Sequence, residues 1–220
     1  MEIDVSRPVL ESNHTIAAQT RQELAEKGIF VINMMSSPGA GKTSLLERTI
    51  EGLKGELRLA VVEGDVQTSH DAERIAGHGV PAVQINTQGA CHLNAKMVVQ
   101  ALSELELDGL DLLVVENVGN LICPASFELG EQARVMLLST TEGEDKPSKY
   151  PLMFRQSNVL IVNKIDLLPH LPFSMEKLRQ EAYKIQSDLT LFELSALTGE
   201  GLEPWLNWLR RGVAESKTRT

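Results

Sequence analysis

A chain of 220 residues is long enough for one α/β domain with a sizeable core, or for two small domains at most. Its net charge of −9 argues against a nucleic-acid-binding surface, and no uninterrupted apolar run approaches the ~20 residues of a membrane span. Two cysteines make no disulfide scaffold, and the N-terminus lacks a secretory signal, so we expect a cytoplasmic protein that binds neither nucleic acid nor membrane.

Apolar segments alternate with helical patterns along most of the chain. A first helix is predicted to be capped by Ser12 or Asn13 and to run to Lys27, with Gly28 as its C-cap. Strands that are apolar on both faces and alternate with helices predict a mostly parallel sheet with helices on both faces. The predicted strands are residues 29–35, 57–63, 80–86, 111–116, 133–139, 158–163 and 190–194, and the clearest later helices are 94–105, 174–187 and 202–213.

These patterns divide the chain into a helical extension over residues 1–28, one α/β domain over 29–215 and a frayed tail over 216–220. The polar stretch 140–151 is predicted to be a mobile surface loop. Trp205 and Trp208 are expected to pack the last helix onto the sheet. Four histidines are too scattered to suggest ligands and are predicted to be surface or structural residues: His14, His70, His78 and His170.

Residues 36–43 (SSPGAGKT) carry the pattern of a phosphate-binding loop between a strand and a helix. Gly39 and Gly41 allow close approach and positive φ, while backbone N–H groups at the helix start attract anionic oxygens. Lys42 can reach the β- and γ-phosphates, and Thr43 can ligate magnesium. Ser36 departs from the usual pattern, which has glycine there. The residues assigned to the phosphates are Ser37, Pro38, Gly39, Ala40, Gly41, Lys42, Thr43 and Ser44.

Two later segments favour guanine over adenine. Residues 163–166 (NKID) follow a predicted strand, and the Asp166 carboxylate offers two acceptors that match guanine N1–H and its exocyclic amine. Lys164 can lie along the base, while Asn163 can tie this segment to the phosphate loop. Ser195, Ala196 and Leu197 resemble the loop that contacts guanine through its backbone. An alternative for residues 163–166 is a polar turn in which Asp166 caps the next segment.

Acidic residues complete the predicted phosphate end. Residues 111–119 form an apolar strand that delivers Glu116 and Gly119 to its carboxyl edge, where sites form in open α/β sheets. Glu116 can orient a magnesium-bound or attacking water, and the Gly119 amide can contact the γ-phosphate. Asp65 is the second candidate for magnesium or water, its alternative being a helix N-cap. We assign catalysis to Lys42, Thr43, Asp65 and Glu116, and magnesium to Thr43 and Asp65.

A thiol and an imidazole stand side by side at Cys91 and His92, and the second thiol is Cys123. This donor set suits nickel, zinc or copper better than magnesium. Adjacent side chains diverge, so Cys91 and His92 need a third ligand from Cys123 or a matching set from a second chain. The alternative is two buried cysteines and a surface histidine. Cys123 lies four residues beyond Gly119, so one loop can link the γ-phosphate to a metal ligand.

Together, residues 36–43, 116–124 (ENVGNLICP), 91–92 and 163–166 resemble the HypB family of hydrogenase nickel-incorporation GTPases. Ser36 in place of glycine and the ENVGNLxCP sequence are both characteristic of that family. The resemblance extends from about residue 13 to residue 212. It implies a single P-loop domain of the SIMIBI type that hydrolyses GTP. It also implies that Cys91, His92 and Cys123 bind nickel or zinc at a GTP-dependent homodimer interface.

The resemblance further implies hydrogenase maturation proteins and the hydrogenase large-subunit precursor as partners, and magnesium with GTP as a cofactor. Three other functions remain open at this point. One is a sibling GTPase that serves urease or a cobalamin-dependent enzyme. A nucleotide-dependent ligase or kinase would need a substrate pocket and would have no use for residues 163–166. The third is a metal-binding scaffold whose nucleotide only sets the oligomeric state.

Overall fold

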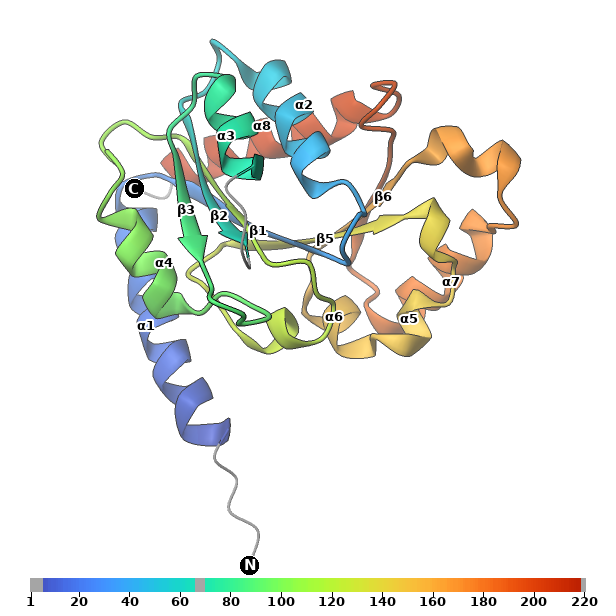
Figure 1. The fold of residues 1–220 in the computed structure, drawn as a ribbon, viewed down its shortest axis with the longest axis horizontal. Coiled ribbons are helices and arrows are strands. Elements are labelled where there is room, and N and C mark those ends of the chain that lie inside the picture. The colour runs from blue at the N-terminus through green and yellow to red at the C-terminus, as the bar shows by residue number, and fades with distance from the viewer. Residues whose placement is uncertain (1–5, 66–69, 219–220) are drawn as a thin grey trace, which may run out of the picture.

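Seven parallel strands form one sheet in the order β3-β2-β4-β1-β5-β6-β7 (Figure 1). The computed structural model describes residues 6–65 and 70–218. All seven predicted strands are present, each with ends within two residues of the expected ones, and all six pairings are parallel. The strands are β1 Phe30–Ser36, β2 Leu59–Asp65, β3 Ala82–Asn86, β4 Leu112–Glu116, β5 Ala133–Ser139, β6 Val159–Asn163 and β7 Thr190–Glu193.

Helices cover both faces of the sheet, as the buried strands require (Figure 1). One face packs against α2, α3 and α8, and the other packs against α1 and α4 on one side and α6 and α7 on the other. None of the described helices has the length and apolar composition needed to cross a membrane. The helices are α1 Ser6–Glu26, α2 Lys42–Leu53, α3 His70–Gly77, α4 Ala95–Leu102, α5 Lys146–Lys149, α6 Pro151–Gln156, α7 Met175–Ile185 and α8 Leu202–Thr218, with 3-10 helices η1 Cys123–Ser126, η2 Thr140–Glu142 and η3 Ile165–His170.

Helix α1 begins earlier than its predicted cap. It includes Ser6, so Ser12 and Asn13 lie in its interior. The Asn13 side chain is buried, and its Oδ1 accepts a hydrogen bond of 2.8 Å from the backbone N–H of Ala95, the first residue of α4. Asn13 therefore provides a hydrogen-bond acceptor for the N-terminus of a different helix, α4. The predicted end is confirmed: Gly28 has φ 71°, and the N–H groups of Gly28 and Ile29 bond back to Ala25 and Leu24.

The segment 140–151 is not the mobile loop that its polarity predicts. It contains η2 and α5 and continues into α6. Ser139 caps η2 and Glu142 bonds back to the Ser139 N–H, which forms a capping box. The Thr140 hydroxyl donates to the Lys164 carbonyl at 2.7 Å. This compact segment therefore supports the loop that follows β6.

The last helix packs as predicted and extends further. Trp205 is completely buried, stacks on Trp208 with ring centroids 5.3 Å apart, and donates its Nε1–H to the Thr49 hydroxyl of α2 at 2.9 Å. Helix α8 runs to Thr218 instead of ending near Val213. Three residues of the segment expected to fray are thus helical, and residues 219–220 lie outside the described part of the chain.

The strand order reverses next to β1, where binding sites form in open α/β sheets. After β1 the chain crosses through α2 to β2 on one side, and after β4 it crosses back to β5 on the other. The carboxyl ends of β1, β2 and β4 therefore lie together. In the register, Glu116 of β4 stands beside Glu63 of β2 and Met34 of β1. This edge carries the candidate site.

Candidate functional site

The loop between β1 and α2 adopts the conformation that its glycines permit. Gly39 and Gly41 have φ 75° and 99°, whereas the buried Ser36 ends β1 as ordinary strand. The position that usually carries glycine thus needs no left-handed backbone here, which explains why serine is accommodated. The Lys42 ammonium lies 3.0 Å from the Ser36 hydroxyl. The Ser37 hydroxyl donates instead to Glu142 of η2.

Acidic side chains gather beside this loop. The Thr43 hydroxyl donates to Glu116 Oε1 at 3.0 Å, and Glu63 and Glu116 are both almost completely buried. Asp65 is the last residue of β2, not the cap of α3, which begins at His70. Glu63 was not singled out from the sequence. The period-2 alternation of β2 could have revealed it, because Glu63 and Asp65 lie on the same face of that strand.

The segment after β6 is tied directly to the phosphate loop, as predicted. The Asn163 amide donates to the Ala40 carbonyl at 2.9 Å, and its oxygen accepts from the Ala196 N–H at 3.0 Å. A Cβ on Gly41 would lie only 2.5 Å from the Asn163 amide nitrogen. Lys164 donates to the Gly39 carbonyl at 2.7 Å. One asparagine therefore fixes three loops relative to one another.

Two adjoining cavities follow from this arrangement. The first, about 580 Å³, is lined by the phosphate loop together with Glu63, Asp65, Glu116 and Gly119. The second, about 510 Å³, is lined by Asn163, Asp166, Ala196 and Leu197, and both share Gly41, Ser44 and Lys164. Of the predicted nucleotide residues, Ser37, Ala40 and Ser195 do not line either cavity. Ser195 is buried and accepts from the Thr198 N–H inside its own loop.

The Asp166 carboxylate is suited to a ligand in the second cavity. Its Oδ1 is shielded from solvent and accepts no hydrogen bond from any residue that the structure describes. Leaving a buried acceptor without a partner costs roughly 1–3 kcal/mol. A hydrogen-bond donor on a bound molecule would remove this cost and thereby favour binding. The alternative role as a helix cap does not apply, because no side chain caps η3, whose N-cap position is Lys164.

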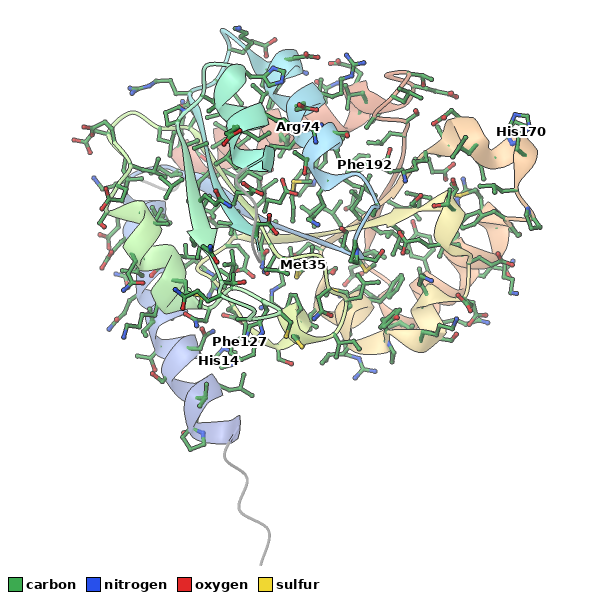
Figure 2. All side chains as sticks on the ribbon, in the orientation of Figure 1. His14, Met35, Arg74, Phe127, His170 and Phe192 are labelled. Carbon is green, nitrogen blue, oxygen red and sulfur yellow. The ribbon has the colours of Figure 1, made fainter. Side chains whose placement is uncertain are left out.

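Two arginines that sequence reasoning missed border these cavities. Arg48 of α2 donates to the carbonyls of Ala196 and Leu197 at 3.0 and 3.2 Å, and thereby holds the loop after β7. Arg74 projects from α3 (Figure 2) and lines the first cavity. Its guanidinium contacts Glu47 at 2.6 and 3.1 Å. Neither contact is visible in a local pattern, because the partners are far apart in the chain.

The predicted thiol and imidazole ligands do converge. The donor atoms of Cys91, His92 and Cys123 all lie within 4.8 Å of one another. Cys91 Sγ and His92 Nδ1 are 3.6 Å apart, so the expectation that adjacent side chains diverge is wrong here. The chain bends at this point after Gln88 and Gly89, which both have positive φ. Small shifts would bring the three donors to the ~3.7 Å spacing of a tetrahedral thiolate site.

Local contacts set the orientation and the protonation of this cluster. The His92 ring packs against Phe127 with centroids 4.0 Å apart, and partial burial lowers its pKa, which favours the neutral imidazole. The neighbouring Cys123 thiol raises the pKa of Cys91. Among the described side chains, this is the one such group found, and Figure 2 shows His170 on the opposite side of the molecule from Phe127. The side chain of His70 lies outside the described part.

Comparisons with known proteins show the family of this chain. Residues 30–193 match the family model described as CobW/HypB/UreG, nucleotide-binding domain. The hydrogenase maturation factor HypB of Azotobacter chroococcum mcd 1 is 50% identical over 210 residues, which cover 95% of this chain and 68% of that protein. HypB from Helicobacter pylori in complex with nickel superimposes with a TM-score of 0.88 at 38% identity, over 93% of this chain and 96% of that one. The signal recognition particle receptor FtsY of Elizabethkingia anophelis, with a TM-score of 0.57 at 13% identity over 86% of this chain and 71% of that one, shares the fold alone.

The parallel sheet, the phosphate loop and the matched nucleotide-binding domain define a P-loop protein, and FtsY shares its fold. Within that class, the identities and coverage above are decisive. The chain belongs to the HypB family of hydrogenase maturation factors, which confirms the resemblance drawn from its motifs.

Proposed function

We propose that this protein is a GTP-hydrolysing metallochaperone that binds nickel and assists its insertion into hydrogenase precursors. The observation that carries the proposal is the single loop from Glu116 to Cys123, which lines the first cavity at one end and bears a thiol ligand at the other. A family of hydrogenase maturation factors with a nickel-complexed member supports the choice of cargo. Nickel and zinc both suit two thiolates and an imidazole.

Guanine selectivity is assigned to the second cavity. Guanine would place N1–H and its amine against Asp166, whereas adenine would leave this carboxylate unmatched. Lys164 and the Ala196–Leu197 backbone border the same cavity. The tight link from Asn163 to the phosphate loop argues against a ligase or kinase, for which residues 163–166 would have no role.

Hydrolysis requires water to attack the γ-phosphorus while the bond to the β–γ bridging oxygen breaks, giving GDP and phosphate. Lys42 and the backbone N–H groups of the phosphate loop stabilise the negative charge on the β- and γ-phosphate oxygens, and Glu116 orients the attacking water. Thr43 and Asp65 would hold magnesium, which supplies further charge neutralisation. The buried carboxylates of Glu63 and Glu116 make this end of the cavity suitable for a cation.

The first experiment tests the phosphate loop. Lys42→Ala should nearly abolish GTP turnover, because Lys42 supplies the positive charge of the loop itself. Lys54→Ala, on an exposed residue at the end of the same helix, is the matched control. Near-normal hydrolysis by Lys42→Ala, or equal affinity of the wild-type chain for GTP and ATP, would contradict the proposal.

The second experiment tests delivery. Nickel-loaded protein should transfer the ion to a hydrogenase large-subunit precursor with GTP but not with a non-hydrolysable analogue. Urease is a second candidate acceptor, since the relative in Helicobacter hepaticus, 41% identical over 97% of this chain and 89% of that protein, is named a hydrogenase/urease maturation factor. The urease apoprotein therefore belongs in the same assay. Equal transfer with GTP and analogue would leave a metal-binding scaffold as the better description.

A further inference from the structure

The segment that bears Cys91 and His92 is held on both sides by side-chain amides from the loop after β4. On one side, the Leu93 N–H donates to Asn117 Oδ1 at 3.1 Å. On the other, the Asn120 amide donates to the Cys91 carbonyl at 3.2 Å. The two asparagines thus bracket His92. We call Asn117 and Asn120 the asparagine clamp.

The same two amides also shape the loop from which they project. Asn117 Oδ1 accepts a second bond, of 3.0 Å, from the Val118 N–H, and Asn120 Oδ1 accepts from the Ile122 N–H at 2.8 Å. Gly119 lies between them against the phosphate loop, since a Cβ there would lie 3.2 Å from Pro38. A displacement of Gly119 therefore acts on Asn120, which follows it in the same loop.

The clamp rests on a rigid base. Asn117 is 1% exposed and donates to Asn33 Oδ1 of β1 at 3.2 Å. Leu93 is completely buried and packs against Gly64, where a Cβ would lie 2.7 Å from the leucine side chain. Gly64 stands between Glu63 and Asp65 at the end of β2. Movement at the phosphate end thus has a direct mechanical route to the segment of residues 91–93.

The far end of the Cys123 segment is fixed as well. Arg134 donates to the Ala125 carbonyl of η1 at 3.0 Å and to the buried Glu131 at 2.7 Å. With η1 anchored and Asn117 anchored, the part of the loop able to shift is the stretch between them, residues 118–122. Such a shift changes the position of Cys91 and His92 relative to Cys123.

We propose that Asn120 is a positioning residue that transmits the nucleotide state to the metal ligands, and that the anchored Asn117 is the positioning residue that fixes the other end of the same segment. The inference rests on the proposed function and adds the residues through which its two sites communicate. Ordering of Gly119 by a γ-phosphate displaces Asn120, which shifts Cys91 and His92 relative to Cys123, while Asn117 holds Leu93 in place. Linkage requires that nickel alter nucleotide affinity by the same factor.

Asn120→Asp is the sharpest variant, because it keeps the acceptor for Ile122 and removes the donor to Cys91, while adding one negative charge. Asn94→Asp is its matched control: it adds the same charge two residues after His92, and aspartate caps α4 as well as asparagine does. Nickel ion alone is titrated into the GDP-bound and analogue-bound forms. In the wild type, the nickel affinities of the two forms should differ by the roughly 5- to 150-fold typical of coupled sites. In Asn120→Asp they should differ by no more than about twofold.

A metal-free measurement covers Asn117. Hydrogen exchange of the Ile122 amide, which bonds to Asn120, should differ between the GDP and analogue forms of the wild type. Exchange of the Leu93 amide should be slow in both forms, and Asn117→Ala should make it fast in both. A wild-type affinity ratio retained in Asn120→Asp would overturn the clamp while leaving the two sites intact. A wild-type ratio of one would remove the coupling itself, and absence of nickel binding would instead remove the proposed function.

Discussion

Gly39 and Gly41 both adopt left-handed backbone in the phosphate loop, yet only Gly41 is hemmed in by a neighbour. Gly41→Ala would place a Cβ 2.5 Å from Asn163, whereas nothing lies within 4 Å of a Cβ on Gly39. Both substitutions carry about 1–2 kcal/mol of backbone strain. Gly41→Ala should cost a further ~1–3 kcal/mol through overpacking. Urea unfolding of the nucleotide-free protein measures the difference, and equal midpoints for the two variants would contradict it.

Asp166→Asn tests base recognition at one atom pair. It replaces one acceptor with a donor facing guanine, so GTP binding should weaken by about 2–4 kcal/mol. Asp188→Asn, on an exposed residue after α7, makes the same chemical change away from the site. Isothermal titration with GTP and ATP gives the result. Unchanged GTP affinity in Asp166→Asn would exclude this carboxylate as the guanine reader.

Residue-scale prediction succeeded where the chemistry lies within one motif. The link from Asn163 to the phosphate loop follows from the sequence because it belongs to a recognisable pattern, although it spans 123 residues. Arg48 escaped notice because its partners, the carbonyls of Ala196 and Leu197, carry no side-chain signature. The approach of Cys91 to His92 was not predicted for another reason. The chain bends after Gln88 and Gly89, and a positive φ at glutamine has no signal in the sequence.

At the scale of elements, the start of α1 is open to a direct test. Ser12 is exposed in the helix interior, whereas Asn13 is buried and bonds to Ala95 and to the Glu128 carbonyl, each at 2.8 Å. Asn13→Ala should lower the free energy of unfolding by about 1–3 kcal/mol, because buried groups lose their partners. Ser12→Ala should be neutral or slightly stabilising. Denaturant midpoints of the two variants test this prediction. Destabilisation by Ser12→Ala alone would instead support Ser12 as the N-cap of the helix.

Strands were predicted better than helix ends, and the reason is physical. A strand buried on both faces is a continuous apolar run, which is visible in the sequence alone. Helix ends depend on partners elsewhere, as Asn13 illustrates. Residues 140–151 were misassigned although a signal was present: Ser139 and Glu142 fit the S-x-x-E capping-box pattern. The polar composition of residues 140–151 predicts a loop, whereas this capping pattern correctly indicates a helical segment.

At the scale of the whole molecule, the exposed ligand cluster points to the surface that a second copy would cover. Cys91 is exposed, and Ile122, next to Cys123, is 65% exposed. A closed two-fold interface would bury this isoleucine and place two ligand sets near the axis. We therefore expect the GTP-analogue form to dimerise through the face that carries Ile122, and the GDP form to be more monomeric.

Ile122→Glu tests this interface without touching a ligand. Burying a charge at the interface should shift the dimer toward monomer by at least tenfold in dissociation constant, since an unpaired buried charge costs several kcal/mol. Val99→Glu makes a comparable change on α4, at a valine that is 42% exposed. Sedimentation velocity over a range of protein concentrations, with GDP and with the analogue, reports the dissociation constants. A dimer weakened equally by Val99→Glu, or unaffected by Ile122→Glu, would place the interface on another face.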